Sequence, residues 1–156
     1  MTLSVSDFQG NPPVVFHPSF SYQRAEIDEA KAIVDFMQTF YEVAFCDWQS
    51  PELTHHILLE SSTIAFTAKK NGGIVGVIMG GILGTRGTIN HLAVDPIYRR
   101  CGIGTELTEM FFQKIKKHGI RRAFLFVSEE NLTANSFWTQ RGFQQIENEI
   151  TLECDF

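Results

Sequence analysis

The sequence predicts a single domain of mixed α/β class, in which helices cover both faces of a mixed β-sheet. Three observations support this prediction: segments of helical periodicity alternate with short apolar runs, an Asn-Gly turn joins two of those runs, and a strand, a helix and a second strand follow as a β-α-β unit. With 156 residues, 44% of them hydrophobic, the chain can bury one compact core. We expect residues 1–156 to form this domain, with residues 1–13 as a flexible polar tail.

The first part of the chain predicts a short strand at 14–17 and two helices. Between residues 26 and 45, apolar side chains recur every three or four positions, which is the period of an amphipathic helix. Ser50 and Pro51 then provide an N-cap and a first-turn proline, so a second helix is expected over 51–60.

The centre of the chain predicts three strands. The runs 64–70 and 74–83 flank an Asn-Gly dipeptide, which tolerates the positive φ angles of a tight turn. They should therefore pair as an antiparallel hairpin. The third run, 88–94, ends at an Asp-Pro pair that closes the strand.

The C-terminal part predicts two helices and two strands. A helix over 103–118 ends in a basic last turn followed by glycine, both typical of a helix C-terminus. The apolar run 123–127 is expected to be a central strand, parallel to the strand before the helix. A further helix over 133–142 and a closing strand over 150–154 complete the chain.

Composition excludes several classes of function. A net charge of −5 argues against binding nucleic acid through phosphate contacts, although residues 99–122 hold seven basic and only two acidic side chains. No apolar run is long enough to span a membrane, and the N-terminus does not read as a signal peptide, so we expect a cytoplasmic protein. The cysteines lie far apart, and His17, His55 and His56 lack metal-ligand spacing, so no metal is expected.

The stretch YRRCGIGTEL, residues 98–107, places two arginines and two glycines at the start of a helix. The first N–H groups of a helix have no acceptor within it, and glycine lets the backbone approach a ligand, so this stretch predicts a phosphate site. The spacing of the glycines and the missing lysine exclude a P-loop. Leu107 occupies the third glycine position of a dinucleotide-binding fingerprint, which argues against that kind of site as well. The remaining pattern is R-x-x-G-x-G over residues 99–104, which follows the sequence LAVDP at residues 92–96.

This pattern resembles the main signature of the GNAT superfamily of N-acetyltransferases, which bind acetyl-coenzyme A. The matching residues are Val94, Asp95, Pro96, Tyr98, Arg99, Gly102, Ile103 and Gly104. A second stretch, 130–143, resembles the other signature of that family through Asn131, Ala134, Phe137, Gly142 and Phe143. The resemblance spans residues 64–147.

The resemblance implies a three-layer fold with a mixed sheet of six to seven strands and a splayed central parallel pair. It also implies an N-acetyltransferase that transfers an acetyl group from acetyl-CoA to a primary amine of a small molecule or peptide, by direct attack in a ternary complex. Dimers are common among such domains, so a homodimer is a further expectation. A non-catalytic acyl-CoA-binding or sensing module and a protein-lysine or N-terminal acetyltransferase are the alternatives.

The resemblance further implies where coenzyme A lies. Its pyrophosphate would bind the backbone amides of residues 100–105, and its pantetheine would lie along the strand over 92–94. Asn131 would reach the pantetheine from the other side. A simple N-cap of the following helix is the alternative role, and both roles could hold together. The cofactor-binding residues expected on this basis are Leu92, Ala93, Val94, Arg99, Arg100, Cys101, Gly102, Ile103, Gly104, Thr105 and Asn131.

The catalytic residues are the least determined by the sequence. Many family members use a tyrosine as general acid where this chain has Trp138, and an indole N–H does not serve as an acid near neutral pH. His91 is the candidate general base, with a structural histidine as the alternative. Cys101 as a covalent nucleophile is a minor alternative. Three aromatic residues are expected either in the acceptor pocket or in the core: Tyr22, Tyr41 and Trp48.

Overall fold

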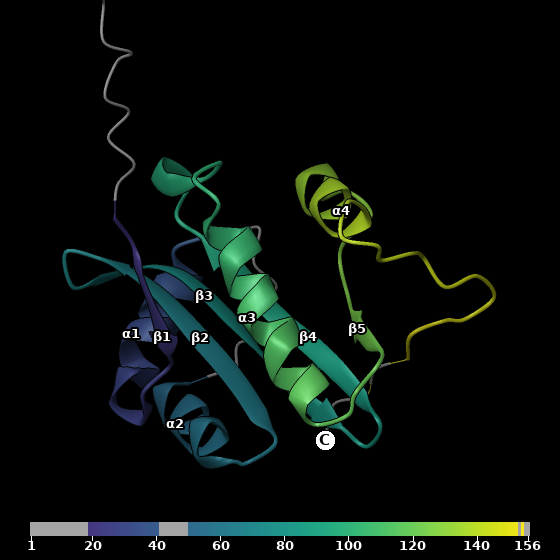
Figure 1. The fold of residues 1–156 in the computed structure, drawn as a ribbon, viewed down its shortest axis with the longest axis horizontal. Helices are drawn as coiled ribbons and strands as arrows, with labels where there is room; N and C mark the ends of the chain where they lie inside the picture. The colour runs from purple at the N-terminus through teal and green to yellow at the C-terminus, as the bar shows by residue number, and fades with distance from the viewer. Residues whose placement is uncertain (1–18, 41–49, 153, 155–156) are drawn as a thin grey trace, which may run out of the picture.

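The computed structural model describes residues 19–40, 50–152 and 154, which contain a five-stranded sheet with helices on both faces (Figure 1). The mixed α/β class predicted from the sequence is therefore confirmed. The strands, which lie in the spatial order of their numbers, are β1 (Ser21–Arg24), β2 (Thr63–Lys70), β3 (Gly73–Leu83), β4 (Arg86–Val94) and β5 (Ala123–Leu125).

The strand pairing follows the predicted pattern. β1 to β4 pair antiparallel with their neighbours, whereas β4 and β5 are parallel. The β2–β3 hairpin turns at Asn71 and Gly72, whose φ angles of 50° and 81° are the left-handed values that an Asn-Gly turn needs. The parallel pair is joined through a helix, as a β-α-β unit requires.

The helices lie in two layers. Figure 1 shows α1 and α2 behind the sheet and α3 in front of it, with α4 beside α3. The helices are α1 (Ala30–Gln38), α2 (Pro51–Leu59), α3 (Ile103–Lys117) and α4 (Leu132–Thr139), together with the short 3-10 helices η1 (Ile27–Glu29) and η2 (Pro96–Tyr98).

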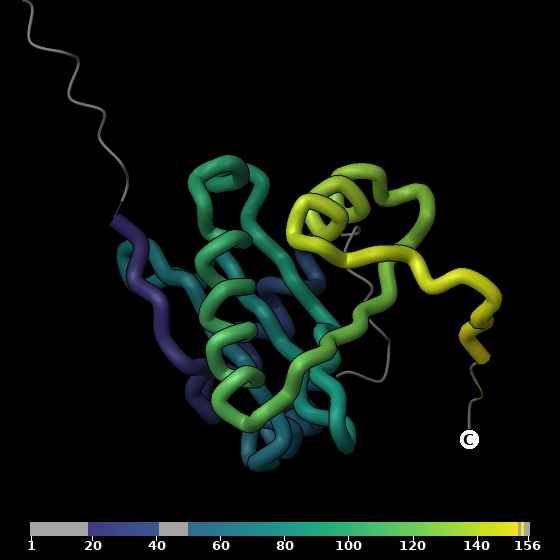
Figure 2. The backbone as a smooth tube through the Cα atoms, turned by 45° about the vertical axis from the view of Figure 1, so that its right-hand side comes forward, coloured from purple at the N-terminus to yellow at the C-terminus, as the bar shows by residue number. Residues whose placement is uncertain are grey.

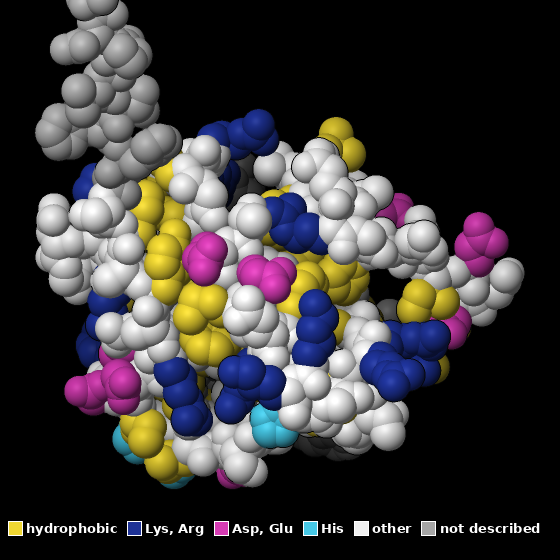
Figure 3. All heavy atoms as spheres, viewed as in Figure 1, with side chains coloured by type: hydrophobic (Ala, Val, Ile, Leu, Met, Phe, Trp, Pro, Cys, Tyr) yellow, Lys and Arg dark blue, Asp and Glu magenta, His cyan; other side chains and the backbone are white. Residues whose placement is uncertain are grey.

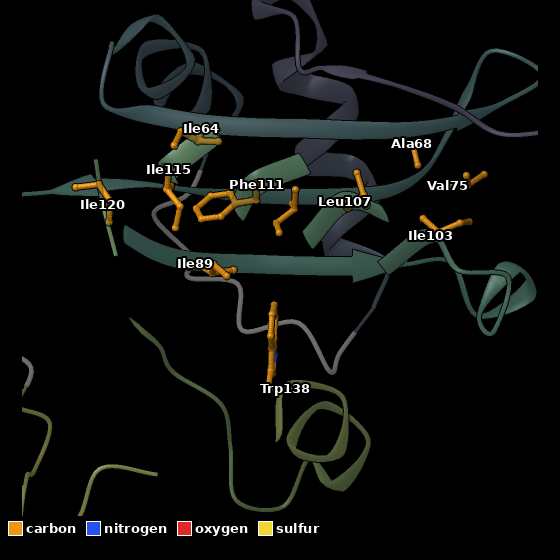
Figure 4. Close-up of a cluster of buried hydrophobic side chains, with 11 residues drawn as sticks. Ile64, Ala68, Val75, Ile89, Ile103, Leu107, Phe111, Ile115, Ile120 and Trp138 are labelled. Atoms are coloured by element: carbon orange, nitrogen blue, oxygen red, sulfur yellow. The ribbon is translucent and has the colours of Figure 1, made fainter. Parts of the chain in front are cut away.

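Each helix layer buries an apolar face against the sheet. On the α3 side, residues spaced four apart along the helix turn toward β3 and β4, and Leu107 and Phe111 are both 0% exposed (Figure 4). On the other side, Ile33 and Met37 of α1 pack over Val77 of β3. The sheet therefore carries two separate cores, one on each face.

Several element boundaries differ from the sequence predictions. The helix expected over 26–45 begins as η1 and ends as α1 at Gln38, and residues 41–49 and the strand expected at 14–17 lie outside the described residues. The strand expected over 123–127 is limited to the three residues of β5. Residues 150–152 form no strand, because an alternating pattern makes a strand only where a partner pairs with it. The described residues thus form five strands rather than six or seven.

A β-bulge in β4 sets the direction of its side chains. Met79 pairs with His91 and Gly80 pairs with Ile89, so Asn90 is an extra residue in the ladder. Ile89 belongs to the core on the α3 side, whereas His91 lies opposite Met79, which belongs to the core on the α1 side. The bulge thus turns His91 toward the face opposite α3.

Candidate functional site

The parallel strands β4 and β5 pair over only a short length. The register runs from Gly87 and Ala123 to Ile89 and Leu125, whereas β4 continues to Val94. Among the described residues, no strand pairs with the β5 side of β4 beyond this point. We call this stretch, residues 90–94, the open edge of β4.

A tight loop connects the open edge of β4 to α3. Asp95 closes the strand by accepting a hydrogen bond from the backbone N–H of Ile97 at 2.9 Å. Arg100 and Gly102 then adopt left-handed φ angles of 66° and 83° before α3 begins. We call residues 99–105 the anion cradle.

The anion cradle presents unshared backbone donors. Glu106 is the first residue whose N–H reaches an acceptor of the helix, the carbonyl of Gly102 at 3.0 Å. The preceding N–H groups of the first turn therefore point outward along the helix axis, where the helix dipole favours an anion. A Cβ atom at Gly102 would meet no heavy atom within 4 Å, so the space beside this glycine is open. Donors at a helix N-terminus suit an anion such as a pyrophosphate.

The arginines of the cradle have different environments. Arg99 folds back, and its Nε donates a hydrogen bond to the carbonyl of Val94 at 3.2 Å. Arg100 and Cys101 are exposed. The structure thus brings the predicted residues Leu92 to Val94 and the cradle together at one corner of the sheet, with a guanidinium fixed at the junction.

Asn131 serves as the N-cap of α4. Its Oδ1 accepts a hydrogen bond from the N–H of Ala134 at 3.0 Å, which satisfies one of the free donors of the helix. Asn135 secures the same loop by donating from Nδ2 to the carbonyls of Ser128 and Asn131, at 2.9 and 3.0 Å. This is the structural role that the sequence left open for Asn131.

Trp138 lies in the core on the α3 side. It is 7% exposed, and its ring makes edge-on contacts with Phe137 and Phe143, with centroid distances of 4.9 and 5.2 Å. Figure 4 shows the indole pointing from α4 toward the sheet, near Ile89. Trp138 therefore fixes α4 on the sheet.

Arg141 is a residue of this region that sequence reasoning missed. Its guanidinium lies 3.4 Å from the ring centroid of Phe137 and donates from Nη1 to the carbonyl of Phe137 at 2.9 Å. It also contacts the hydroxyl of Thr105 in the first turn of α3. Burial lowers the pKa of Arg141 from its ordinary value. The one signal for Arg141 in the sequence is its position directly before Gly142 of the second motif.

Phe137 and Arg141 join the anion cradle to α4. A Cβ atom at Gly104 would lie 3.3 Å from Cε2 of Phe137, so the second glycine of the motif permits this packing as well as a close approach of ligand. A groove of about 340 Å³ runs between the two helices, lined by Thr105, Thr108, Glu109, Phe112, Gln140 and Arg141.

His91 is the buried titratable side chain of β4. It is 8% exposed, and burial lowers its pKa below the ordinary value of 6.5. The imidazole is therefore neutral near neutral pH and can accept a proton. It lies at the open edge of β4, on the face away from α3.

Of the other described candidates, Tyr22 lies close to Cys101 of the anion cradle, whereas His55 and His56 lie elsewhere. Tyr22 packs against the α3-side core, and burial together with the nearby Glu106 and Cys101 raises its pKa. His55 and His56 are exposed on α2, where they line a separate groove of about 350 Å³. The described residues contain no group of three side chains able to hold a metal ion. Three further candidates lie outside the described residues: His17, Tyr41 and Trp48.

The surface charge near α3 is mixed. Figure 3 shows Lys and Arg side chains scattered over the α3 face, with a few acidic side chains among them. Glu106 lies in the first turn of α3, and Lys114, Lys116 and Lys117 lie toward its end. These lysines complement the helix dipole at the C-terminus and lie at the far end of the helix from the anion cradle.

The fold is similar to those of solved acetyltransferase structures. One solved structure of this fold is the PaiA N-acetyltransferase from Thermoplasma acidophilum in complex with coenzyme A. It has a TM-score of 0.74 and 19% identity, and the match covers 84% of this chain and 93% of that one. Another is an aminoglycoside acetyltransferase from an uncultured soil metagenomic sample, in complex with sisomicin, with a TM-score of 0.74, 18% identity and coverage of 88% and 96%.

The chain belongs to the acetyltransferase (GNAT) family, whose sequence profile matches residues 26–143. The resemblance inferred from the two motifs is therefore confirmed. Among curated relatives, an acetyltransferase of Pectobacterium atrosepticum is 35% identical over 85 residues. That match covers 54% of this chain and 60% of the relative, so the chain spans less than two thirds of the relative's length.

Proposed function

We propose that this protein transfers the acetyl group of acetyl-CoA to a primary amine of a small molecule or peptide. The observation that carries the proposal is the open edge of β4 leading directly into the anion cradle. An extended acyl-pantetheine chain ending in a pyrophosphate has the matching sequence of chemical groups: backbone-like amides along a strand edge, then an anion at a helix N-terminus.

Each part of coenzyme A has residues suited to it. The pyrophosphate would bind the backbone amides of the cradle, with Arg99 and Arg100 supplying positive charge. The pantetheine amides would bind the backbone of Leu92, Ala93 and Val94 as an added strand does. A contact between Asn131 and the pantetheine remains a prediction. The N-cap that Oδ1 of Asn131 provides to α4 is compatible with it.

The reaction forms a C–N bond to the acceptor amine and breaks the C–S bond of the thioester. A primary amine with a pKa of about 10.4 must first lose a proton, which costs about 5 kcal/mol near neutral pH, whereas a thiol with a pKa of about 8.5 leaves at a cost of about 2 kcal/mol. A group that removes the proton from the amine therefore lowers the barrier more than a group that protonates the leaving thiolate. We propose that His91, neutral because it is buried, accepts the amine proton.

Protonation of the departing thiolate does not require a protein acid. The indole of Trp138 is packed in the core and does not release a proton near neutral pH, so we propose that water protonates the thiolate. Cys101 is exposed in the cradle, at the pyrophosphate end of the proposed site. Direct transfer is therefore preferred to an acetyl-cysteine route.

The location of the protein and its domain organisation stay predictions. No described helix is long and apolar enough to cross a membrane. A cytoplasmic location, a single domain over 1–156 and a homodimer are the expectations carried forward from the sequence.

Thiol release from acetyl-CoA tests the proposed function. The purified protein is incubated with acetyl-CoA and a panel of polyamines, amino acids, aminoglycosides and peptides, and free thiol is followed with a chromogenic reagent. We expect release that depends on one class of amine, with an acetylated product of the corresponding mass. Tight binding of acetyl-CoA without turnover on any acceptor would favour the binding module, and turnover only on a folded protein would favour a protein acetyltransferase.

A further inference from the structure

Two phenylalanines lie on the face of β5 that points away from α3. Ala123 and Leu125 pack against the core on the α3 side, and side chains alternate between the two faces of a strand, so Phe124 points to the opposite face. The ring of Phe126 lies edge-on to that of Phe124, with a centroid distance of 5.8 Å. Both rings therefore lie on the face away from α3. We call Phe124 and Phe126 the aromatic pair.

His91 lies on the same face of the sheet, on the neighbouring strand. The last paired residues of β4 and β5 are Ile89 and Leu125, so Phe126 is the next residue along the chain after β5. On β4 the next positions are the bulged Asn90 and then His91, which the bulge turns away from α3. The aromatic pair and His91 therefore flank the point where the two strands separate.

The separation of the strands places the reacting end of the proposed site at this point. Figure 2 shows β4 (teal) continuing toward the anion cradle, whereas the chain after β5 (green) leads toward α4. The pyrophosphate would bind beyond Val94, at the far end of the open edge of β4. The thioester, at the other end of the pantetheine, would then lie toward the beginning of that edge, near Asn90 and His91.

The acceptor amine has one face of the sheet from which to approach. On the α3 side, the buried indole of Trp138 occupies the space near Ile89 (Figure 4). The opposite face carries His91, the proposed base, together with the aromatic pair. An amine that reaches the thioester from this face would therefore lie against the two rings.

The aromatic pair presents an apolar surface to this approach. Phe126 is 71% exposed, and Phe124 is partly exposed. A single exposed ring is common on a protein surface, but two adjoining rings beside a reacting group form a surface on which an apolar substituent can be buried. The hydroxyl and ammonium groups of an aminoglycoside or a polyamine would instead lose water against rings that offer them no hydrogen-bond acceptor.

We propose that the aromatic pair determines acceptor specificity and that the acceptor is a primary amine carrying an aromatic or aliphatic group. The apolar group packs on Phe126 and Phe124, and the amine nitrogen faces His91 and the thioester. The inference rests on the proposed function, because it names the class of acceptor for the same site.

Initial rates with two sets of primary amines test the class of acceptor. The apolar set contains phenethylamine, tryptamine and hexylamine, and the polar set contains spermidine and kanamycin. We expect kcat/KM to be at least about tenfold higher for the apolar set, because burying one ring or alkyl chain supplies that factor. A higher kcat/KM for spermidine or kanamycin would overturn the proposal.

Phe126→Ala tests the surface itself. We expect kcat/KM for the apolar set to fall about tenfold, mainly through the KM of the amine, while KM for acetyl-CoA is unchanged. Phe126→Leu keeps an apolar side chain and should recover most of the loss with hexylamine. Leu83→Ala, which removes another exposed apolar side chain at the end of β3, is the matched control and should change neither KM. An equal loss with both sets of amines, or no loss with either, would contradict a role in specificity.

Failure of this inference and failure of the proposed function give different results. Thiol release with spermidine or kanamycin that Phe126→Ala leaves unchanged would overturn the specificity role and leave the acetyltransferase activity established. Binding of acetyl-CoA without thiol release on any amine of either set would overturn the proposed function, and this inference with it.

Discussion

At the scale of single residues, the site depends on a few backbone and side-chain environments. Arg100 and Gly102 take left-handed φ angles, which turn the first N–H groups of α3 outward. His91 is buried on the face of β4 away from α3, and Trp138 is buried in the core on the α3 side. Substitutions of Gly102 and His91 can separate a functional effect from a structural one.

Gly102→Ala should weaken acetyl-CoA binding. A residue with a Cβ costs roughly 1–2 kcal/mol at a left-handed φ, so we expect the loop to shift and KM for acetyl-CoA to rise about tenfold. Gly119→Ala is the matched control, because Gly119 also has a left-handed φ, 75°, and open space around it, but lies at the far end of α3. Both variants should lose similar thermal stability. An equal rise of KM in both variants would argue against binding of the acetyl-CoA pyrophosphate at the anion cradle.

His91 should make the free energy of unfolding depend on pH. Because burial lowers the pKa of His91 in the folded state, the unfolded chain takes up the proton first as the pH falls. The free energy of unfolding should therefore be highest above about pH 6.5 and decrease below it. In His91→Gln this part of the pH dependence disappears, as measured by urea unfolding at pH 7.5 and 5.5.

The catalytic role of His91 needs a separate readout. If it is the general base, His91→Gln should lower kcat more than it changes KM for acetyl-CoA and should remove the acidic limb of the pH–rate profile. Unchanged kcat/KM with an unchanged profile would leave His91 as a structural residue.

At the scale of elements, α4 is joined to α3 by side chains at its C-terminal end. Trp138 and Phe143 fill the space between α4, α3 and the sheet, and Arg141 bonds the end of α4 to Thr105 in the first turn of α3. Because β4 leads into α3 and β5 leads into α4, this contact spans the two sides of the diverging pair. The position of α4 relative to the cradle therefore depends on Arg141.

Arg141→Ala should loosen α4 without changing the chemistry. We expect a loss of about 1 kcal/mol of stability for the missing hydrogen bonds, a several-fold rise of KM for acetyl-CoA and a nearly unchanged kcat. Arg141→Lys keeps the charge but not the planar stacking on Phe137, and should recover only part of the loss. Lys114→Ala, on the exposed side of α3, is the control and should change neither quantity. A loss confined to kcat would contradict a positioning role.

At the scale of the whole molecule, the sheet is held between two apolar cores. The core on the α3 side includes Leu107 and Phe111, both fully buried, and holds α3 against the sheet. The core on the other side holds α1 over β3. Damage to the α3-side core should therefore unfold the protein and disorder the site together.

Phe111→Ala should destabilise the whole domain. Removing a fully buried phenyl ring costs about 3–5 kcal/mol, a large fraction of the stability of a domain of this size. We expect the midpoint of thermal unfolding, followed by circular dichroism, to fall by more than about 10 °C. Leu83→Ala is the control, because Leu83 is 66% exposed at the end of β3 and should leave the midpoint within about 2 °C. A small shift for Phe111→Ala would mean that the core on this side is not the main source of stability.

The sequence by itself determined the local features of the fold. The Asn-Gly turn, the capped start of α2 and the limits of α3 follow from backbone preferences and periodicity, which act over a few residues. The same applies to the first motif, whose glycines and arginines suit an anion at a helix N-terminus. The family itself was indicated by the resemblance of both motifs to its signatures.

Only the tertiary structure decided how these parts meet. The resemblance implied that the central parallel pair splays apart, but the sequence does not reveal that β4 and β5 separate after three paired residues, that a bulge turns His91 away from α3, or that Arg141 reaches Thr105 across 36 positions. It also predicted a strand over 150–154 that stays outside the sheet at 150–152. Each outcome depends on which strand or helix becomes a neighbour, and such long-range pairing is not encoded in the periodicity of any one segment.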